Sequence, residues 1–168
     1  MTAWLRILAF AGAGLIVWTT AASRVAEQTR LPVGSVVAGA TVTQPFGCTT
    51  LALEPFAPFC PSLHMHTGVD LAARAGTPVV AATGGVARVG YDAAGAGIFV
   101  AIRFDGHTRV LYCHLLRAEV GSGDVIIAGQ TIGLVGATGL ATGPHVHLEI
   151  QIDGQAVDPA RWLAAPGP

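Results

Sequence analysis

Two histidine clusters are the residues of this sequence best suited to chemistry. His145 and His147 lie in the stretch Gly143–Ile150, where polar and apolar residues alternate with the period of a β-strand. Successive side chains of a strand point to opposite faces, so the two imidazoles project from one face, with their backbones about 7 Å apart. Two imidazoles placed in this way can share a metal ion, or one can bind metal while the other transfers a proton.

The second cluster is the run from His64 to Asp70, which also contains His66. In an extended chain His66 and Asp70 would lie about 13 Å apart, too far for two ligands of one ion, so the chain must turn between them. We expect the turn at Gly68, because glycine tolerates unusual dihedral angles. An imidazole and a carboxylate that converge there, with one imidazole of the histidine strand, form the three-ligand set of a catalytic zinc site.

The other histidines carry weaker signals. A lone histidine is usually a surface residue or a satisfied core residue, whereas two clusters with ligand spacing favour a metal site. His107 follows a turn signal, and we assign it no function. His64 has the strand parity of His66, so it either belongs to the site or only flanks it.

Composition and turn signals indicate one β-rich domain. The 168 residues suffice for a single core, and 22 glycines and 10 prolines indicate many turns. The formal net charge of −1 gives no indication of a nucleic-acid partner. Short strands between turns predict an antiparallel all-β domain over residues 35–163. The expected elements are strands at Gly39–Gln44, Pro78–Val89, Gly97–Phe104, Thr108–Leu115, Asp124–Val135, His145–Ile152 and Gln155–Val157, hairpin turns at Asp105-Gly106 and Asp153-Gly154, and helical turns at Leu116–Val120 and Pro159–Leu163.

The N-terminal segment predicts export. Arg6 is the only charge before an apolar run from Ile7 to Ala22, which ends in small residues as a secretory signal peptide does. An uncleaved membrane anchor is the alternative for residues 1–22. In both cases we expect residues 23–34 to form a linker and residues 164–168 a short tail. The domain between them would lie in the cell envelope or the extracellular medium.

The three cysteines are consistent with export. Cys48 and Cys60 bracket a loop, and an exported protein permits a disulfide between them; two unpaired thiols are the alternative. Cys113 precedes His114 in an expected strand, where neighbouring side chains face opposite ways. This disfavours a catalytic thiol–imidazole pair, and we expect Cys113 to be a small core residue.

A series of short motifs runs through most of the part expected to be exported. In order they are Thr43–Gly47, His66–Ala72, Gly76–Val79, Ala81-Ala82 with Gly84–Val86, Tyr112–Leu115, Gly129–Gly133, Gly136–Gly139 and Thr142–Glu149. Together they resemble the lysostaphin-type (LytM-type) zinc endopeptidases, which cut peptidoglycan cross-links. Each motif alone is a moderate signal, and their common order and spacing make the resemblance specific.

The resemblance implies a fold, a metal ion and roles for five residues. The fold would be the sandwich-like antiparallel β-domain of this family, a barrel-sandwich hybrid with the active site in a groove. His66, Asp70 and His147 match the family's Zn²⁺ ligands. His114 and His145 match its two catalytic histidines that do not bind metal. One would act as the base toward water and the other would stabilise the oxyanion, and the sequence leaves open which does which.

The presence of all five implies an active endopeptidase acting on stem or cross-bridge peptides of peptidoglycan. A catalytically silent module, which binds peptidoglycan or regulates another wall hydrolase, is the alternative. We expect a monomer that meets the membrane only through an uncleaved N-terminal segment. The sequence departs from the family pattern at two positions: Cys113 stands where a small residue such as Ala is usual, and Leu148 where Phe is common. Both look like packing changes. Glu149 shares a strand face with His147 and is either its partner or an ordinary strand carboxylate.

Overall fold

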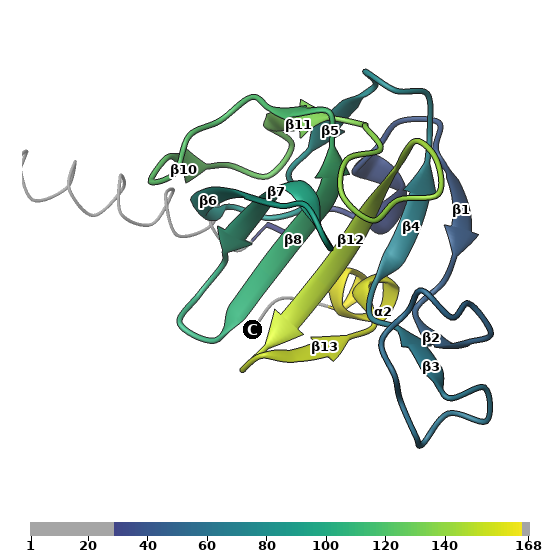
Figure 1. Ribbon diagram of the computed structural model, residues 1–168. Coiled ribbons are helices and arrows are strands. Elements are labelled where there is room, and N and C mark those ends of the chain that lie inside the picture. Colours follow the sequence, from purple (N-terminus) through teal and green to yellow (C-terminus); the bar gives the residue numbers. More distant parts are fainter. Residues whose placement is uncertain (1–28, 166–168) are drawn as a thin grey trace, which may run out of the picture.

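The computed structural model describes residues 29–165, whose regular secondary structure consists almost entirely of antiparallel strands (Figure 1). The elements in chain order are η1 (Val33–Ser35), β1 (Thr41–Gln44), β2 (Gly47–Thr49), β3 (His64–His66), β4 (Val69–Ala72), β5 (Pro78–Val80), β6 (Gly85–Asp92), β7 (Gly97–Arg103), β8 (Thr108–Leu115), β9 (Arg117–Ala118), β10 (Val125–Ile126), β11 (Thr131–Leu134), β12 (His145–Ile152), β13 (Gln155–Val157) and α2 (Pro159–Ala164). The predicted antiparallel all-β class is therefore confirmed. The predicted signal peptide or anchor, residues 1–22, lies outside the described residues.

One large sheet dominates the molecule, with the order β1-β4-β12-β8-β7-β6-β10, and β13 pairs with β12. A three-stranded sheet has the order β5-β11-β9, and β2 and β3 form a separate two-stranded ribbon beside the end of β4 (Figure 1). Two of the three eight-residue strands within residues 29–165, β8 and β12, lie next to each other in the middle of the large sheet. Their neighbour β4 carries the carboxylate of the second histidine cluster, so the sheet order itself brings both clusters together.

Buried and partly buried side chains alternate along β12, so one face of the large sheet is apolar and the other is polar at this strand. Val146, Leu148 and Ile150 are fully buried, whereas the residues between them are only partly buried. The buried side chains belong to a core that also includes Val79 and Ile132 from the three-stranded sheet. Burial of each such aliphatic side chain contributes about 1.5–3 kcal/mol, which holds the two sheets together. The polar face of β12 is thereby left for the candidate site.

Several element predictions need correction. Leu116–Val120, predicted to be a helical turn, contains β9, because its backbone pairs with β11. The predicted strands Pro78–Val89 and Asp124–Val135 are each divided in two by a turn. The prediction of a helix at Pro159–Leu163 is confirmed by α2, whose first amides bond to the Asp158 side chain. The three short strands β2, β3 and β4 were not predicted.

Both predicted hairpin turns are present. Asp105-Gly106 joins β7 to β8, and Asp153-Gly154 joins β12 to β13. Asp153 and Gly154 have φ angles of 50° and 82°, so both occupy the left-handed region that tight two-residue hairpin turns require.

Strand β8 contains an irregularity beside the candidate site. Its register against β7 shifts between Ile98 and Val100, so one residue of β7 stands against Cys113 and His114. His114 has a φ of 61°, which is rare for a residue other than glycine. A bulge of this kind turns side chains out of regular alternation. The expectation that Cys113 and His114 face opposite ways is therefore wrong, and both line the same groove.

The first described residues lie against the domain. Arg30 forms a β-bridge with Thr83, and its guanidinium lies 3.8 Å from the centre of the Trp162 ring and donates to the Trp162 carbonyl. Such a cation–π contact contributes about 0.5–1 kcal/mol or more. The predicted linker 23–34 thus has its described part docked on the domain near α2. Within residues 29–165 no helix has the length and apolar character of a membrane span.

Candidate metal centre

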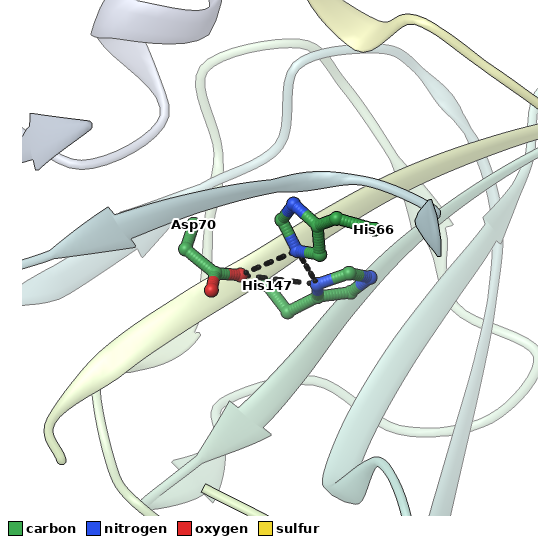
Figure 2. A group of neighbouring side chains, drawn as sticks. All are labelled: His66, Asp70 and His147. Atoms are coloured by element: carbon green, nitrogen blue, oxygen red, sulfur yellow. Dashed lines mark hydrogen bonds and ion pairs between the residues drawn. The ribbon is translucent and has the colours of Figure 1, made fainter. Parts of the chain in front are cut away.

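Three side chains from separate strands or turns point toward one another (Figure 2). They are His66, Asp70 and His147, whose potential ligand atoms all lie within 4.8 Å of one another. His66 Nε2 lies 2.9 Å from His147 Nδ1 and 3.1 Å from Asp70 Oδ1, and His147 Nδ1 lies 3.0 Å from the same oxygen. The structure therefore brings together the three residues predicted as metal ligands.

Strand pairing explains two of these three positions. His147 of β12 is the direct cross-strand partner of Asp70 of β4, and directly opposed side chains are close neighbours in a sheet. His66 ends β3 and reaches the pair because the chain turns between β3 and β4. Gly68 occupies this turn as predicted. The reason is not an unusual dihedral angle, since its φ is not positive. An added Cβ would instead lie 2.4 Å from the Leu148 carbonyl oxygen and 2.7 Å from His147 Nε2.

The ionisation of the cluster follows from its contacts. Burial opposes ionisation of Asp70, but hydrogen bonds from His147 and His66 outweigh it and hold the pKa of this carboxyl well below its usual range. Burial also opposes a charged His147, yet hydrogen bonds to Asp70 and Glu149 raise its pKa to about 9. Without a metal ion, a proton on His147 therefore balances the buried carboxylate.

Two further histidines lie beside the three. The rings of His114 and His145 are 4.8 Å apart, and the centre of the His114 ring is 6.2 Å from that of His147. His114 Nδ1 lies 2.9 Å from the Thr138 carbonyl oxygen, and His145 Nδ1 lies 2.8 Å from that of Gly143. A carbonyl oxygen only accepts, so both rings carry a proton on Nδ1 and leave Nε2 free to accept or donate.

Burial lowers the pKa of His114, so this ring is neutral near pH 7. His145 Nε2 lies 3.8 Å from Asp70 Oδ1, which places it next to the cluster of three. The site residues predicted from the sequence are thus all brought into one place. Two adjacent imidazoles can exchange protons with a bound water or substrate.

A groove of about 320 Å³ is lined by four of these five side chains, and the fifth, His66, is buried beneath it. One wall comes from the Cys48–Cys60 loop and its surroundings, and the opposite wall comes from the loops before β7 and before β12. The residues on the two walls are Gln44, Leu51, Leu53, Glu54 and Pro55 on one side, and Gly95, Ala96, Leu140 and Thr142 on the other. The groove is therefore mostly apolar at its rims and polar at its floor.

The Cys48–Cys60 loop is closed by a disulfide, with the two Cα atoms 5.4 Å apart. Cys113 is a buried free cysteine, and burial raises the pKa of its thiol to about 12. A thiol with so high a pKa is a poor nucleophile, so Cys113 does not supply the chemistry of the groove.

Some contacts of the site carry no sequence signal. His66 Nδ1 is held 2.9 Å from the Pro45 carbonyl oxygen, which directs its Nε2 toward Asp70. Thr67 donates to Glu149 over 2.7 Å.

His64 lies outside the cluster of three and bonds to the Glu54 carbonyl, and exposed His107 pairs with Asp153. Main-chain partners distant in sequence could only be found from the fold.

The donor set fits a zinc ion. Two imidazole nitrogens and one carboxylate oxygen converge, and this is the ligand set of several catalytic zinc sites. The other nitrogen of each candidate imidazole ligand is hydrogen-bonded to a carbonyl or carboxylate oxygen, as metal-bound histidines usually are. The groove leaves the cluster accessible on one side, so a further ligand has room to bind.

Fold and site together define a β-domain with a candidate metal centre at the floor of an open groove. Comparison with known families makes this specific, because residues 64–159, more than half of the chain, match the model of peptidase family M23. The chain belongs to this family, which confirms the resemblance identified from the motifs.

Individual relatives agree with this assignment. The chain is 44% identical over 95 residues to an uncharacterized metalloprotease of Haemophilus influenzae, covering 56% of this chain and 20% of that protein. It is 43% identical over 111 residues to the DD-carboxypeptidase/endopeptidase Mpg of Neisseria meningitidis, covering 64% of this chain and 25% of the relative. The matched region thus spans about a quarter or less of these relatives.

A solved structure shows the same fold. The catalytic domain of the antimicrobial peptidase lysostaphin from Staphylococcus simulans superposes with a TM-score of 0.62 at 31% identity. The match covers 75% of this chain and 93% of that domain. The sandwich-like lysostaphin-type fold predicted above is therefore confirmed.

Proposed function

We propose that this protein is a zinc endopeptidase that hydrolyses peptide bonds in the stem or cross-bridge peptides of peptidoglycan. The observation that carries the proposal is the convergence of His66, Asp70 and His147 beside two further imidazoles in one open groove. When bound, zinc would supply Lewis-acid chemistry, polarising a carbonyl and lowering the pKa of a water molecule. His66, Asp70 and His147 would hold the ion.

The remaining chemistry falls to His114 and His145. Each holds its Nδ1 proton on a main-chain carbonyl and presents Nε2 on the groove side. One ring accepts the proton of the attacking water, and the other, when protonated, stabilises the oxyanion of the tetrahedral intermediate. The bulge in β8 and the strand β12 hold the two rings side by side, so neither has to move far to act.

The shape of the groove supports a peptide substrate. Its two walls can bind an extended segment, and the apolar side chains of Leu51, Leu53 and Leu140 offer contacts for small apolar side chains. Relatives named as peptidoglycan DD-endopeptidases and as a DD-carboxypeptidase/endopeptidase support wall peptides as the substrate class. The disulfide-closed loop forms a rim of the groove, and rim loops commonly set specificity.

We place the protein outside the cytoplasm, as a monomeric domain in the cell envelope. The apolar N-terminal segment, whether cleaved or retained as an anchor, and the Cys48–Cys60 disulfide support export. The silent-module alternative is not favoured, because all five candidate side chains are present and line or adjoin the groove. The described residues 29–34, part of the predicted linker, do not line it.

The test is to incubate the purified protein with peptidoglycan of several cross-link chemotypes and identify released peptides by mass spectrometry. We expect about one zinc per chain and cleavage of one cross-link type. His66→Ala, Asp70→Asn and His147→Ala should each lose zinc and cleavage together, because each removes one of three ligands. A zinc-loaded wild-type protein that cleaves none of the chemotypes would refute the proposal.

A further inference from the structure

His147 presents its two ring nitrogens to two different sets of partners. Nδ1 lies 2.9 Å from His66 Nε2 and 3.0 Å from Asp70 Oδ1, inside the candidate metal centre. Nε2 lies on the other side of the ring, 3.4 Å from Glu149 Oε2. The ring can bind a metal through Nδ1 only if the proton of the neutral imidazole is on Nε2. Whatever accepts a hydrogen bond from Nε2 therefore favours the ligating tautomer.

The Glu149 carboxylate is held firmly for this task. Its side chain is only 15% exposed, and its Oε2 accepts a hydrogen bond of 2.7 Å from Thr67 Oγ1. The Gln151 side-chain amide donates to Oε1, the other oxygen. A carboxylate this buried is costly unless its oxygens are bonded, and here each has a donor besides His147. Glu149 is thus a fixed acceptor, not a mobile surface charge.

Thr67 links this acceptor to the other two ligand positions. It lies in the turn between His66 and Asp70, so its hydrogen bond joins the ligand turn to the ligand strand β12. Gly68, the next residue, contacts the same imidazole, because an added Cβ would lie 2.7 Å from His147 Nε2. The turn that carries two candidate ligands therefore also covers the ring of the third.

We propose that Glu149 is a positioning residue for the metal centre, and that Thr67 acts through it. Glu149 accepts the Nε2 hydrogen of His147 and so keeps the Nδ1 lone pair directed at His66 and Asp70. The Thr67 hydroxyl fixes the carboxylate and sets the distance between the ligand turn and β12. This inference rests on the proposed function, in that zinc is the ion held.

The experiment measures zinc affinity by competition with a chromogenic chelator, in the full chain and in three variants. Glu149→Ala should weaken zinc binding about 10- to 100-fold, as loss of a partner of a metal-bound histidine usually does. Glu149→Gln should restore most of the affinity, because its amide oxygen can still accept from Nε2 and Thr67, while the Gln151 amide turns over and releases the exposed Arg109 side chain to solvent. Thr67→Val, which removes one hydroxyl with little change of shape, should lie between wild type and Glu149→Ala.

Glu119→Ala is the matched control, since this carboxylate pairs with Arg117 away from the groove. It should bind zinc as the wild type does. Nitrogen-15 NMR of the zinc-loaded wild type should show the His147 proton on Nε2. If Glu149→Ala does not fold, the zinc affinities of Thr67→Val and Glu149→Gln test the inference without it.

Three results would overturn the inference. One is wild-type zinc affinity in Glu149→Ala or Thr67→Val while the wild type binds zinc and cleaves, which leaves the proposed function intact. Another is an affinity for Glu149→Gln as low as for Glu149→Ala, which would make net charge and not a placed acceptor the cause. A wild type that binds no zinc would remove the proposed function and this inference together.

Discussion

At the scale of single residues, the site is organised by which nitrogen each imidazole presents. His66 bonds through Nδ1 to a carbonyl and presents Nε2, whereas His147 bonds through Nε2 to Glu149 and presents Nδ1. His114 and His145 keep their Nδ1 protons on carbonyls. Four rings of the same chemistry thus divide into two candidate ligands and two candidate proton-transfer groups, because their second nitrogens have different partners.

This division predicts the outcome of replacing the two proton-transfer groups. His114→Ala and His145→Ala should each lower kcat/KM by about 100-fold or more, the usual range for losing a general acid or base. Zinc content should stay at the wild-type value, because neither ring is in the cluster of three. Peptide release and metal analysis on the same preparations check both statements. His107→Ala, at an exposed histidine, is the control, and zinc loss in either site variant would contradict the division.

His107 gives a pH-dependent prediction of its own. Its hydrogen bond to Asp153 raises the pKa of this exposed histidine above the ordinary value of 6.5. A raised folded-state pKa stabilises the fold at pH below the unfolded value, and this contribution is lost as the pH rises through the folded-state pKa. An NMR titration should find the His107 midpoint above 6.5. Asp153→Asn, which keeps a residue tolerant of positive φ, should lower the titration midpoint of His107. An unchanged midpoint would contradict the hydrogen bond between His107 and Asp153.

At the scale of elements, strands with local alternation or a hairpin signal could be predicted, among them the three-residue β13, whereas β2, β3, β4 and β9 could not. β8 and β12 each run for eight residues and alternate over much of their length, so periodicity identifies them. β3 has three residues, two of them histidines, and exists because it pairs with β2. β9, predicted to be helical, is likewise defined by its partner β11. Pairing between segments that are distant in the sequence cannot be predicted from the local residue pattern.

The bulge in β8 shows the same limit at the site. Family resemblance identified His114, but its orientation depends on the register shift against β7. Nothing in the run Tyr112–Leu115 indicates that His114 takes a φ of 61°. His66 and Asp70 could be located because they are four residues apart with a turn between them, and His147 because it lies two residues from His145 on one strand. The carbonyls that set their tautomers could not, since Pro45 is 21 residues from His66 and Thr138 is 24 residues from His114.

The disulfide-closed loop leads to a prediction about an element. The bond spans a sequence separation of 12 residues, and a loop of this length contributes about 3 kcal/mol to stability in the chain-entropy model. The double variant Cys48→Ser/Cys60→Ser should lose stability on this order in chemical denaturation. It should also raise KM more than it lowers kcat, because Leu51, Leu53 and Glu54 line the groove but not the chemistry. Wild-type KM in the double variant would show that the loop does not contact substrate.

At the scale of the whole molecule, the sheet order explains why one small domain can hold such a site. β4, β12 and β8 are consecutive in the large sheet, and together they carry Asp70, His147, His145 and His114. Their opposite face packs into the core, where Val110, Leu148 and Ile150 are fully buried. The polar groups therefore lie on a rigid floor, and the variable part of the groove is left to loops, which change more easily than strands.

A rigid site that binds its ion only when folded couples metal binding to global stability. A ligand that binds only the native state at 100 times its dissociation constant adds about 2.7 kcal/mol, or roughly 10 °C in Tm for a domain of this size. Removing zinc with a chelator should therefore lower Tm by this order and abolish peptide release, and added zinc should restore both. Asp70→Asn, which keeps the size of the side chain but loses the charged ligand, should show no zinc-dependent shift. An equal shift in Asp70→Asn and wild type would mean that zinc stabilises the fold from somewhere other than the groove.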